Sequence, residues 1–426
     1  MPERRDTMIS VDDALRSILD RLHPVGEEIV SIADALDRRL AADYASRRAQ
    51  PAMDVSSMDG YAVRAADLAV VPARLNCVAS VPAGSGLSPT IPPGACARIF
   101  TGAAMPPGTD TVVIQENTEV DATGRIIVTE PIAAQGQWVR RAGLDFDDGD
   151  MLLRLGTTLG PAEIGLAAAM NHPWLRVYRR PRVAILATGD EIALPGDPLS
   201  AISLPSSNSF QLMAMVRRAG GEPVHCGIVP DDPDQVRRRV FQAAATADLV
   251  VSSGGASVGD HDHIQRLFGG PPDEGCPTSG QGTARTERHF WKIAMRPGKP
   301  LLFGTLADTP MLGLPGNPVS CFVCGLIFMT PAIRRLTGAT TDAIEKESDD
   351  RSVLARVTHK LEANDHRQDY LRARLQRDSE GGWEVHAFEK QDSSMMSVLA
   401  KSNGLIVRPP HAAATKSGEF VSVIKL

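Results

Sequence analysis

The chain has 426 residues, 43% of them hydrophobic and 23% charged, which is typical of a soluble globular protein and too long for one compact core. Its 51 acidic and 45 basic residues leave a formal net charge of −6, which argues against a nucleic-acid-binding protein with a strongly basic surface. This total does not exclude an anionic substrate, because the local field inside a cleft decides which ion binds there.

The chain carries no signal of secretion or membrane insertion. Its first six residues are charged and contain no apolar signal-peptide region. The most apolar run, residues 311–329, is interrupted by the turn 315–318, and the part after the turn is shorter than the roughly 20 residues that a bilayer requires. The six cysteines are scattered, as is typical of reduced thiols. We therefore expect a cytoplasmic protein.

The first 178 residues predict two helical segments around a β-rich segment. Ser10, with Asp13 three residues later, resembles a capping box and starts a helix expected to run to about His23. From residue 51 to 150, short β-prone pieces alternate with Gly and Pro turns, which indicates a small β-rich domain. These pieces are residues 98–100, 111–115 and 126–128. Residues 152–170 favour a turn and then a helix that begins near Pro161.

From residue 182 to about 331, apolar strands alternate with helices, which predicts a parallel sheet covered on both faces. The expected strands are residues 183–187, 223–229, 249–252 and 310–314. Helices are expected from about residue 207 to 220, from Pro233 to about 245 with Asp232 as the cap, and after Pro318. The Gly- and Pro-rich stretch 269–285 predicts a solvated insertion. Beyond residue 335 the pattern alternates again, which predicts a C-terminal β-barrel or small β domain.

Three of these strands end in loops suited to an anionic ligand. Carboxyl ends of parallel strands meet at one edge of a sheet, and glycines and helix N-termini there expose backbone N–H groups to phosphate oxygens. Any one of these loops alone is explained equally well by an ordinary turn, and none is a Walker motif. Together they predict one anion site. Its expected residues are Thr188, Gly189, Ser253, Gly254, Gly255, Ser257, Gly259, Pro315, Gly316, Asn317 and Pro318.

Cations and carboxylates near these loops extend the predicted site. Lys292, Arg296 and Lys299 follow the insertion closely and are expected to clamp oxyanion oxygens, with a solvated basic edge as the alternative. Carboxylates at loop tips suit Mg²⁺, which takes one or two of them together with substrate phosphate. The candidates are Asp231, Asp260 and Asp262, although Asp231 alone is better explained as part of the helix start.

Two other patterns carry no chemistry. His261 and His263 flank a carboxylate, but two histidines on one turn without a further ligand do not predict a zinc site. Cys321 and Cys324 are better explained as buried thiols of an apolar helix than as a redox pair.

Ordered blocks along nearly the whole chain resemble one family. Pro51, Asp54 and the run Met58-Asp59-Gly60-Tyr61-Ala62-Val63 are similar to the signature Pro-x-x-Asp-x-Ser-x-Met-Asp-Gly-Tyr-Ala of the molybdopterin molybdenumtransferases and the gephyrin E domain. Further blocks of this family match residues 98–103, 139–145 and 158–166. The strand-end loops, segment 292–300 and the turn 314–318 complete the set in order.

The resemblance implies an elongated, multi-domain α/β plus β fold. Its four domains would be a discontinuous helical stalk (7–45 and 146–178), an inserted β-rich domain (46–145), an α/β molybdopterin-binding domain with a parallel-rich sheet (179–335), and a C-terminal β-barrel domain (336–426). It also implies a homodimer, with the active cleft between the α/β domain of one subunit and the β domain of the other. That arrangement would bring in the motif residues Asp59, Thr101, Arg140 and Asp145, although Asp59 alone is explained by a simple turn.

The activity implied is a transfer in which molybdate replaces adenylate on molybdopterin. Adenylylated molybdopterin would bind with its phosphates over the Gly-rich loops, and molybdate would bind among Lys292, Arg296, Lys299 and Ser393. Mg²⁺, held by Asp231 and Asp262 with Asp260 or Glu191 nearby, would help AMP to leave. The catalytic residues implied are Asp59, Asp145, Glu191, Asp231 and Asp262.

The chain departs from the family pattern at three places. Arg296 stands where many members carry Lys, the insertion 269–285 is longer than usual, and Ser393 lacks the flanking glycines of its motif. Two other functions stay open: a related protein that adenylates molybdopterin, which would not need the β insert, and a non-catalytic scaffold, since the gephyrin E domain also binds receptor peptides. The family further implies the molybdopterin adenylyltransferase and molybdoenzymes as partners, and neither nucleic acid nor membrane.

Overall fold

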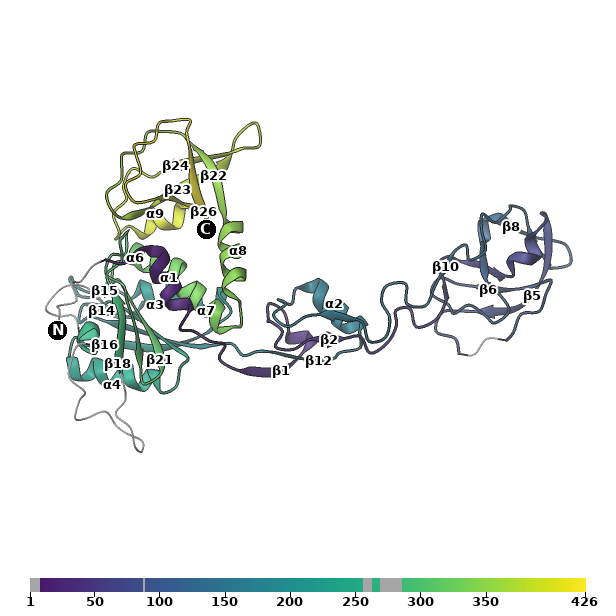
Figure 1. The fold of residues 1–426 in the computed structure, drawn as a ribbon, viewed down its shortest axis with the longest axis horizontal. Coiled ribbons are helices and arrows are strands. Elements are labelled where there is room, and N and C mark those ends of the chain that lie inside the picture. The colour runs from purple at the N-terminus through teal and green to yellow at the C-terminus, as the bar shows by residue number, and fades with distance from the viewer. Residues whose placement is uncertain (1–7, 87–88, 256–262, 269–285) are drawn as a thin grey trace. The chain divides into compact units, whose positions relative to one another are not determined.

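The computed structural model describes residues 8–86, 89–255, 263–268 and 286–426. The chain divides into two compact units, one formed by Met1–Glu28 with Val177–Leu426 and the other by Ile29–Arg176. We call them the large unit and the insert unit (Figure 1). The expected residues Ser257, Gly259, Asp260 and Asp262 and the insertion 269–285 lie outside the described residues.

The large unit contains a six-stranded sheet. Its order is β16(Glu222–Val229)-β13(Arg182–Thr188)-β17(Leu249–Ser253)-β21(Thr309–Leu314)-β20(Leu302–Leu306)-β18(Thr286–Trp291). The first four strands are parallel, which confirms the parallel-rich sheet expected from the sequence. The edge pair β20 and β18 is antiparallel and was not expected as strands. A short parallel pair, β14(Ile192–Ala193) and β15(Leu204–Pro205), follows the loop after β13.

Helices cover both faces of this sheet because alternate residues of each strand point to opposite sides. Val183 and Ile185 of β13 pack in the cluster that contains α1(Val11–Leu19) and α3(Ser207–Arg218). Ala184 and Leu186 face the other cluster, with α4(Pro233–Ala244) and α5(His263–Arg266). The apolar strand pattern that predicted a doubly covered sheet is therefore confirmed.

The helix α1 begins as expected but ends earlier. The Ser10 hydroxyl accepts a hydrogen bond from the Asp13 backbone N–H at 3.1 Å and donates one to the Asp13 carboxylate at 2.7 Å. The helix ends at Leu19 instead of near His23. The N–H groups of Arg21 and Leu22 bond three residues back, in a tighter turn that often finishes a helix before a proline such as Pro24.

The longest helix of the large unit forms its centre. It consists of α6(Pro318–Cys324), a π-helical turn η4(Gly325–Met329) and α7(Thr330–Leu336). With 19 residues it is longer than the sequence suggested, and its length and composition alone would allow a membrane span. However, 61% of its most apolar window is buried inside the large unit, which is the behaviour of a core helix.

The C-terminal part of the large unit is a closed β-barrel. Its strands are β22(Ser352–Val357), β23(Gln368–Arg377), β24(Trp383–Ala387), β25(Gly404–Arg408) and β26(Phe420–Lys425). They follow the order β23-β24-β22-β26-β25, and β25 pairs back with β23 to close the ring. The short strand β19(Met295–Arg296) pairs with the start of β23. The expected barrel is confirmed. The sequence analysis predicted only strands beyond residue 335, however, and missed the helices α8(Thr341–Arg351) and α9(Met396–Lys401).

The insert unit is built around a second six-stranded sheet. Its order is β7(Thr111–Ile114)-β4(Gly60–Val63)-β6(Ala95–Ile99)-β5(Ala73–Val81)-β9(Ile126–Val128)-β8(Thr118–Val120). Two small pairs, β3(Val55–Ser56) with β10(Val139–Arg140) and β2(Tyr44–Ala45) with β11(Met151–Leu153), accompany it. The remaining elements are the helix α2(Pro161–Ala169) and three 3₁₀ turns, η1(Ile32–Asp34), η2(Ala65–Leu68) and η3(Gln115–Asn117). The chain passes between the units through the strand pair β1(Glu27–Ser31) and β12(Trp174–Tyr178).

Candidate functional site

The carboxyl ends of β13, β17 and β21 open into one cleft of about 790 Å³ in the large unit. We call it the strand-end cleft. It brings together most of the residues that the sequence analysis assigned to an anion site. The expected residues that line it are Thr188, Gly189, Glu191, Asp231, Ser253, Gly254, Gly255, Pro315, Gly316, Asn317 and Pro318.

Hydrogen bonds join the loops around this cleft. The Gly254 N–H donates to the Leu314 carbonyl at 3.2 Å, which links the ends of β17 and β21. The Asp231 N–H donates to the Asp190 carboxylate at 3.0 Å, which links the ends of β16 and β13. Asn208, at the start of α3, also lines the cleft and bonds to two of these loops. The sequence analysis did not assign Asn208 to the site.

Two described carboxylates, Glu191 and Asp231, line the cleft. The Glu191 carboxylate folds back over Gly189, where a Cβ would lie 2.7 Å from one of its oxygens. Among the described residues no group of three or more His, Cys, Asp or Glu side chains is arranged to hold a metal ion. Two carboxylates fit Mg²⁺, which completes its shell with water and phosphate oxygens, but they do not form a closed site by themselves.

A second hollow of about 420 Å³ lies beside the cleft and shares Pro300, Asn317 and Ser320 with it. We call it the basic pocket. Its lining includes Arg296, Lys299 and Ser393 of the expected oxyanion site. Lys292 is not among its lining residues, since its ammonium lies over the Trp291 ring, 3.9 Å from the ring centre.

The two expected cations of the basic pocket differ in their surroundings. Arg296 donates to the Asp369 carboxylate through Nε at 2.8 Å and through Nη2, and also to Asn364 Oδ1 at 3.2 Å. The bond to Asp369 raises the pKa of Arg296 against the opposing effect of burial. Most of its charge is therefore offset locally, and exposed Lys299 carries more of the pocket's free charge.

Sequence reasoning missed Arg372, which also lines the basic pocket. Only 1% of this residue is exposed. Its guanidinium donates to the carbonyls of Met395 at 3.1 Å, Lys390 at 3.3 Å and Asp392 at 2.8 Å, and so holds the loop that carries Ser393. The alternating pattern of β23 predicts that Arg372 points outward to solvent. No signal in the local sequence shows that the loop containing Ser393 covers this outer face of the strand.

The insert unit holds a separate cluster around Asp59. One oxygen of the Asp59 carboxylate accepts hydrogen bonds from the Thr101 backbone N–H at 2.7 Å and from the Thr101 hydroxyl at 2.8 Å. These bonds, and the charge of Arg98, lower the pKa of Asp59 against a small desolvation effect. The next position, Gly60, requires glycine. A Cβ there would lie 1.9 Å from the Val113 carbonyl oxygen, too close for any other residue.

Arg140 and Asp145 belong to the same unit and are exposed. The segment before them is tied to the Asp59 turn, because the Ser57 hydroxyl donates to the Trp138 carbonyl at 2.9 Å. Asp54, part of the same sequence block, accepts from the Ala142 N–H at 2.9 Å and pairs with Arg141 at 2.5 Å. These bonds, led by that from Ala142, lower the pKa of Asp54, although burial opposes them.

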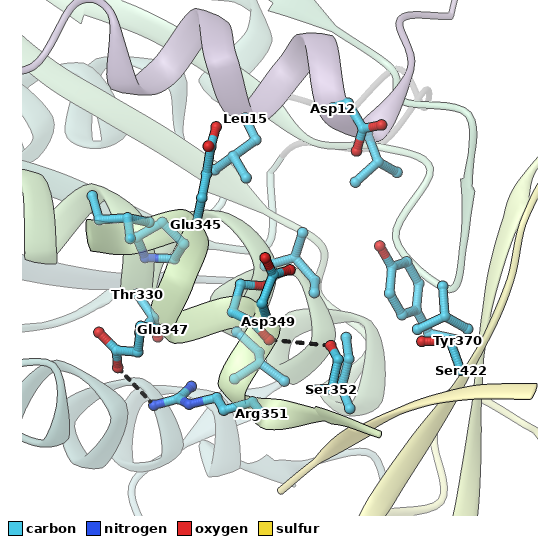
Figure 2. Close-up of a pocket in the computed structure, with 18 of the residues that line it drawn as sticks. Asp12, Leu15, Thr330, Glu345, Glu347, Asp349, Arg351, Ser352, Tyr370 and Ser422 are labelled. Atoms are coloured by element: carbon cyan, nitrogen blue, oxygen red, sulfur yellow. Dashed lines mark hydrogen bonds and ion pairs between the residues drawn. The ribbon is translucent and has the colours of Figure 1, made fainter. Parts of the chain in front are cut away.

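Another pocket of the large unit, of about 310 Å³, is lined by α1, α8 and strands of the barrel. Figure 2 shows the carboxylates of Asp12, Glu345 and Asp349 around it, with an ion pair between Glu347 and Arg351. None of the described residues expected at the anion site lines this pocket. Its excess of carboxylates would repel a phosphate or molybdate ion, so it is not the anion site.

Comparisons with known proteins agree with this arrangement. Three family models match in order: "MoeA N-terminal region (domain I and II)" over residues 9–171, "Probable molybdopterin binding domain" over residues 184–335, and "MoeA C-terminal region (domain IV)" over residues 355–426. The molybdopterin molybdenumtransferase of Nostoc is 37% identical over 435 residues, which cover 100% of this chain and 94% of the relative.

Other relatives extend the similarity. The molybdopterin molybdenumtransferase of Haemophilus influenzae is 32% identical, covering 98% of each chain. The crystal structure of the molybdopterin biosynthesis moea protein from Pyrococcus horikoshii has a TM-score of 0.80 and 28% identity, covering 98% of this chain and 99% of that one. Sequence blocks, fold and full-length similarity agree, and the chain belongs to the molybdopterin molybdenumtransferase family, transferases of molybdenum cofactor biosynthesis.

Proposed function

We propose that this protein transfers molybdenum from molybdate to adenylylated molybdopterin and releases AMP. The observation that carries this proposal is the continuity of the strand-end cleft with the basic pocket, which share three lining residues. A pterin nucleotide and a small oxyanion can thus lie next to each other, as the reaction requires. In this reaction the phosphoanhydride bond to the adenylyl phosphorus is cleaved, and an oxygen from molybdate or water takes its place so that AMP leaves. The two dithiolene sulfurs that the substrate itself contributes replace oxygen ligands of molybdenum, and the displaced oxygen leaves as water.

The two hollows suit different parts of the reactants. Gly254 and Gly255 leave room for backbone N–H groups to approach phosphate oxygens, and the start of α6 at Pro318 adds the positive end of a helix. The basic pocket offers Lys299 and the hydroxyl-bearing loop around Ser393 to molybdate. Arg372 holds this loop, so we add it to the residues that act on the oxyanion.

The magnesium ion belongs to the proposal as well. Glu191 and Asp231 would hold it, with Asp260 and Asp262 as further candidates outside the described residues. When bound, Mg²⁺ supplies charge stabilisation to the phosphate that leaves with AMP. The two carboxylates also orient water. Because they repel anions, they confine the phosphate to the Gly-rich loops.

We further propose a cytoplasmic homodimer with the four-domain division expected from the sequence. In it, Asp59, Thr101, Arg140 and Asp145 of one subunit would complete the cleft of the other. This role is supported by the exposure of Thr101, Arg140 and Asp145. Exposed side chains are accessible to a ligand. The molybdopterin adenylyltransferase and molybdoenzymes would act before and after this enzyme.

A direct assay tests the proposal. Purified full-length protein is mixed with adenylylated molybdopterin, molybdate and Mg²⁺, and AMP release is measured. Asp59→Asn, Asp231→Asn and Asp262→Asn should each reduce turnover at least about 100-fold while folding stays intact, since each removes a charge from the reaction site. Asp308→Asn, the same change in an exposed turn between β20 and β21, should leave turnover unchanged.

Three results would contradict the proposal or its magnesium part. Formation of the adenylate from ATP and molybdopterin would assign the protein to the preceding step instead. Full turnover of the Asp59, Asp231 and Asp262 variants would favour a non-catalytic scaffold or a site elsewhere in the chain. Omitting magnesium should stop AMP release in the wild type, and a rate that does not depend on the metal would remove it from the proposal.

A further inference from the structure

One side chain, Asn208, connects two loops of the strand-end cleft. It lies in the first turn of α3, and its amide nitrogen Nδ2 donates to the Ser253 hydroxyl oxygen at 2.7 Å and to the Gly316 carbonyl oxygen at 2.7 Å. Ser253 ends β17 and Gly316 follows β21, so a residue from a third element holds both. No described hydrogen bond of Asn208 caps its own helix.

The donors and acceptors fix the direction of these bonds. A carbonyl oxygen such as that of Gly316 can only accept, so the atom of Asn208 that faces it must be the NH₂ group. This group has two hydrogens, and the second one points to the Ser253 oxygen. Ser253 therefore acts as an acceptor toward Asn208, and its own hydroxyl hydrogen is left over.

Among the described residues, a second side chain that contacts the Ser253 hydroxyl is also a donor. The Cys321 Sγ atom lies 3.9 Å from the Ser253 oxygen, inside the core. Burial raises the pKa of Cys321 to about 12, so the thiol keeps its proton and can donate but accepts only weakly. Ser253 itself is only 4% exposed, and its remaining open side is the strand-end cleft that it lines.

We propose that Asn208 is a positioning residue that makes the Ser253 hydroxyl a hydrogen-bond donor toward the phosphate of the ligand in the strand-end cleft. A hydroxyl normally rotates between donating and accepting, and the Asn208 amide removes this choice. The cleft then prefers a ligand that only accepts hydrogen bonds, such as a phosphate. This inference rests on the proposed function, because it assumes that a phosphate binds in the cleft.

Replacing Asn208 with aspartate tests the proposal with almost no change in shape. A carboxylate cannot donate to the Gly316 carbonyl, and it would accept the Ser253 hydrogen that otherwise points to the ligand. A hydrogen bond to a charged group is worth about 1.5–3 kcal/mol, which corresponds to roughly 10- to 100-fold in affinity. We expect Asn208→Asp to weaken binding by at least this factor, because it also adds a negative charge.

The measurement is calorimetric binding of AMP to the full-length protein with Mg²⁺ present. Four proteins form a cycle: wild type, Asn208→Ala, Ser253→Ala and the double variant. Asn208→Ala and Ser253→Ala should each weaken AMP binding, and the double variant should be no weaker than the weaker single variant, because Asn208 acts through Ser253. Asn208→Asp is measured beside them. Asn117→Asp, the same change at a hydrogen-bonded residue of the insert unit, should bind AMP like the wild type.

The outcomes separate the inference from the proposed function. If the wild type does not bind AMP, the proposed function fails. If the wild type binds AMP and the Asn208 variants bind it equally well, the proposed function stands and the inference is overturned. Additive losses in the double variant would also overturn it, since they would mean that Asn208 only supports the loops. Because the cycle uses alanine variants, it decides the question even if Asn208→Asp does not fold.

Discussion

The Asp59 carboxylate shows how neighbouring groups fix the orientation and charge of a side chain. Thr101 donates two hydrogen bonds to the same oxygen, Oδ1, so the other oxygen is left for a partner outside this cluster. Because the same bonds lower the pKa of Asp59, the side chain stays ionised throughout the neutral range. Arg98 stabilises this arrangement from one side, held between the rings of Tyr61 and Phe100 with 5.1 Å to each ring centre.

At the scale of one residue, the barrel provides a test of pH dependence. Burial lowers the pKa of His359, the neighbouring His386 lowers it further, and Glu389 acts in the opposite direction. The unfolded chain therefore binds a proton at His359 more readily than the folded protein. The contribution of His359 to the free energy of unfolding is therefore fully present above the ordinary histidine pKa of about 6.5. It is lost as the pH drops below that value.

Replacing His359 with phenylalanine keeps a ring next to His386, whose centre lies 4.4 Å away, but removes this titration. We expect the fall in Tm between about pH 7.5 and 5.5 to be smaller than in the wild type, by about 1–3 °C. Thermal unfolding at a series of pH values measures this. Above pH 7.5 the two proteins differ only in packing, which serves as the internal reference. An equal fall in both proteins would show that His359 does not contribute.

Single residues differ in how far their roles could be predicted. Thr188, Gly254 and Gly316 were predicted because each follows an apolar strand, and strand ends of a parallel sheet must meet. Asn208 and Arg372 could not be predicted in the same way. Their roles depend on which distant loop lies against each side chain, and a single sequence contains no signal of that.

At the scale of elements, the strands of the parallel sheet were predictable because burial on both faces leaves a continuous apolar run. The antiparallel pair β18 and β20 was not, since it follows the long insertion and β18 carries charged residues on a partly exposed edge. The helix α8 was also missed. Its cap, Thr340, accepts from the Ala343 N–H at 3.2 Å, but its highly charged sequence shows little apolar periodicity.

The turn before Lys299 depends on close packing against α6. Gly298 has a φ of +117°, and a Cβ there would lie 2.5 Å from the Cys324 Sγ atom and 3.2 Å from the Met295 side chain. Gly298→Ala should therefore displace the turn and destabilise the protein by about 1–3 kcal/mol. Urea unfolding measures the loss, and binding of molybdate should weaken because Lys299 moves with the turn.

A second substitution identifies the cause. Cys324→Ala removes the sulfur that the new Cβ would strike, so the double variant should lose less stability than the sum of the single variants predicts. The backbone conformation at Gly298 still disfavours alanine, so recovery should be partial. If the two losses simply add, the close contact with Cys324 is not what makes glycine necessary.

At the scale of the whole molecule, the residues expected at the site lie in two separate units of the chain. The strand-end cleft and the basic pocket belong to the large unit, whereas Asp59, Thr101, Arg140 and Asp145 belong to the insert unit. Strand pattern and residue type predicted most of the first set, apart from Asn208, Arg372 and Ser393, but none of the second. The second set was expected only through the resemblance of its sequence blocks to a family, because a turn aspartate on a small β domain has no chemical meaning by itself.

The proposed dimer can be tested by mixing variants. If each cleft combines the large unit of one subunit with the insert unit of the other, a heterodimer of Asp59→Asn and Asp231→Asn subunits has one cleft with both changes and one with neither. Random mixing of equal amounts makes about half of the dimers heterodimers, so the mixture should recover about a quarter of wild-type turnover. Each variant alone should be nearly inactive in the AMP-release assay.

Recovery identifies the partner's insert unit as the source of Asp59, because a cleft built within one chain would carry one of the two changes in every subunit of the mixture. The two variants are unfolded and refolded together so that the subunits exchange. Mixing Asp59→Asn with the double variant provides the control, since every cleft then carries at least one change and no turnover should appear. A mixture of the single variants that stays inactive despite proven subunit exchange would place all the catalytic groups within one chain.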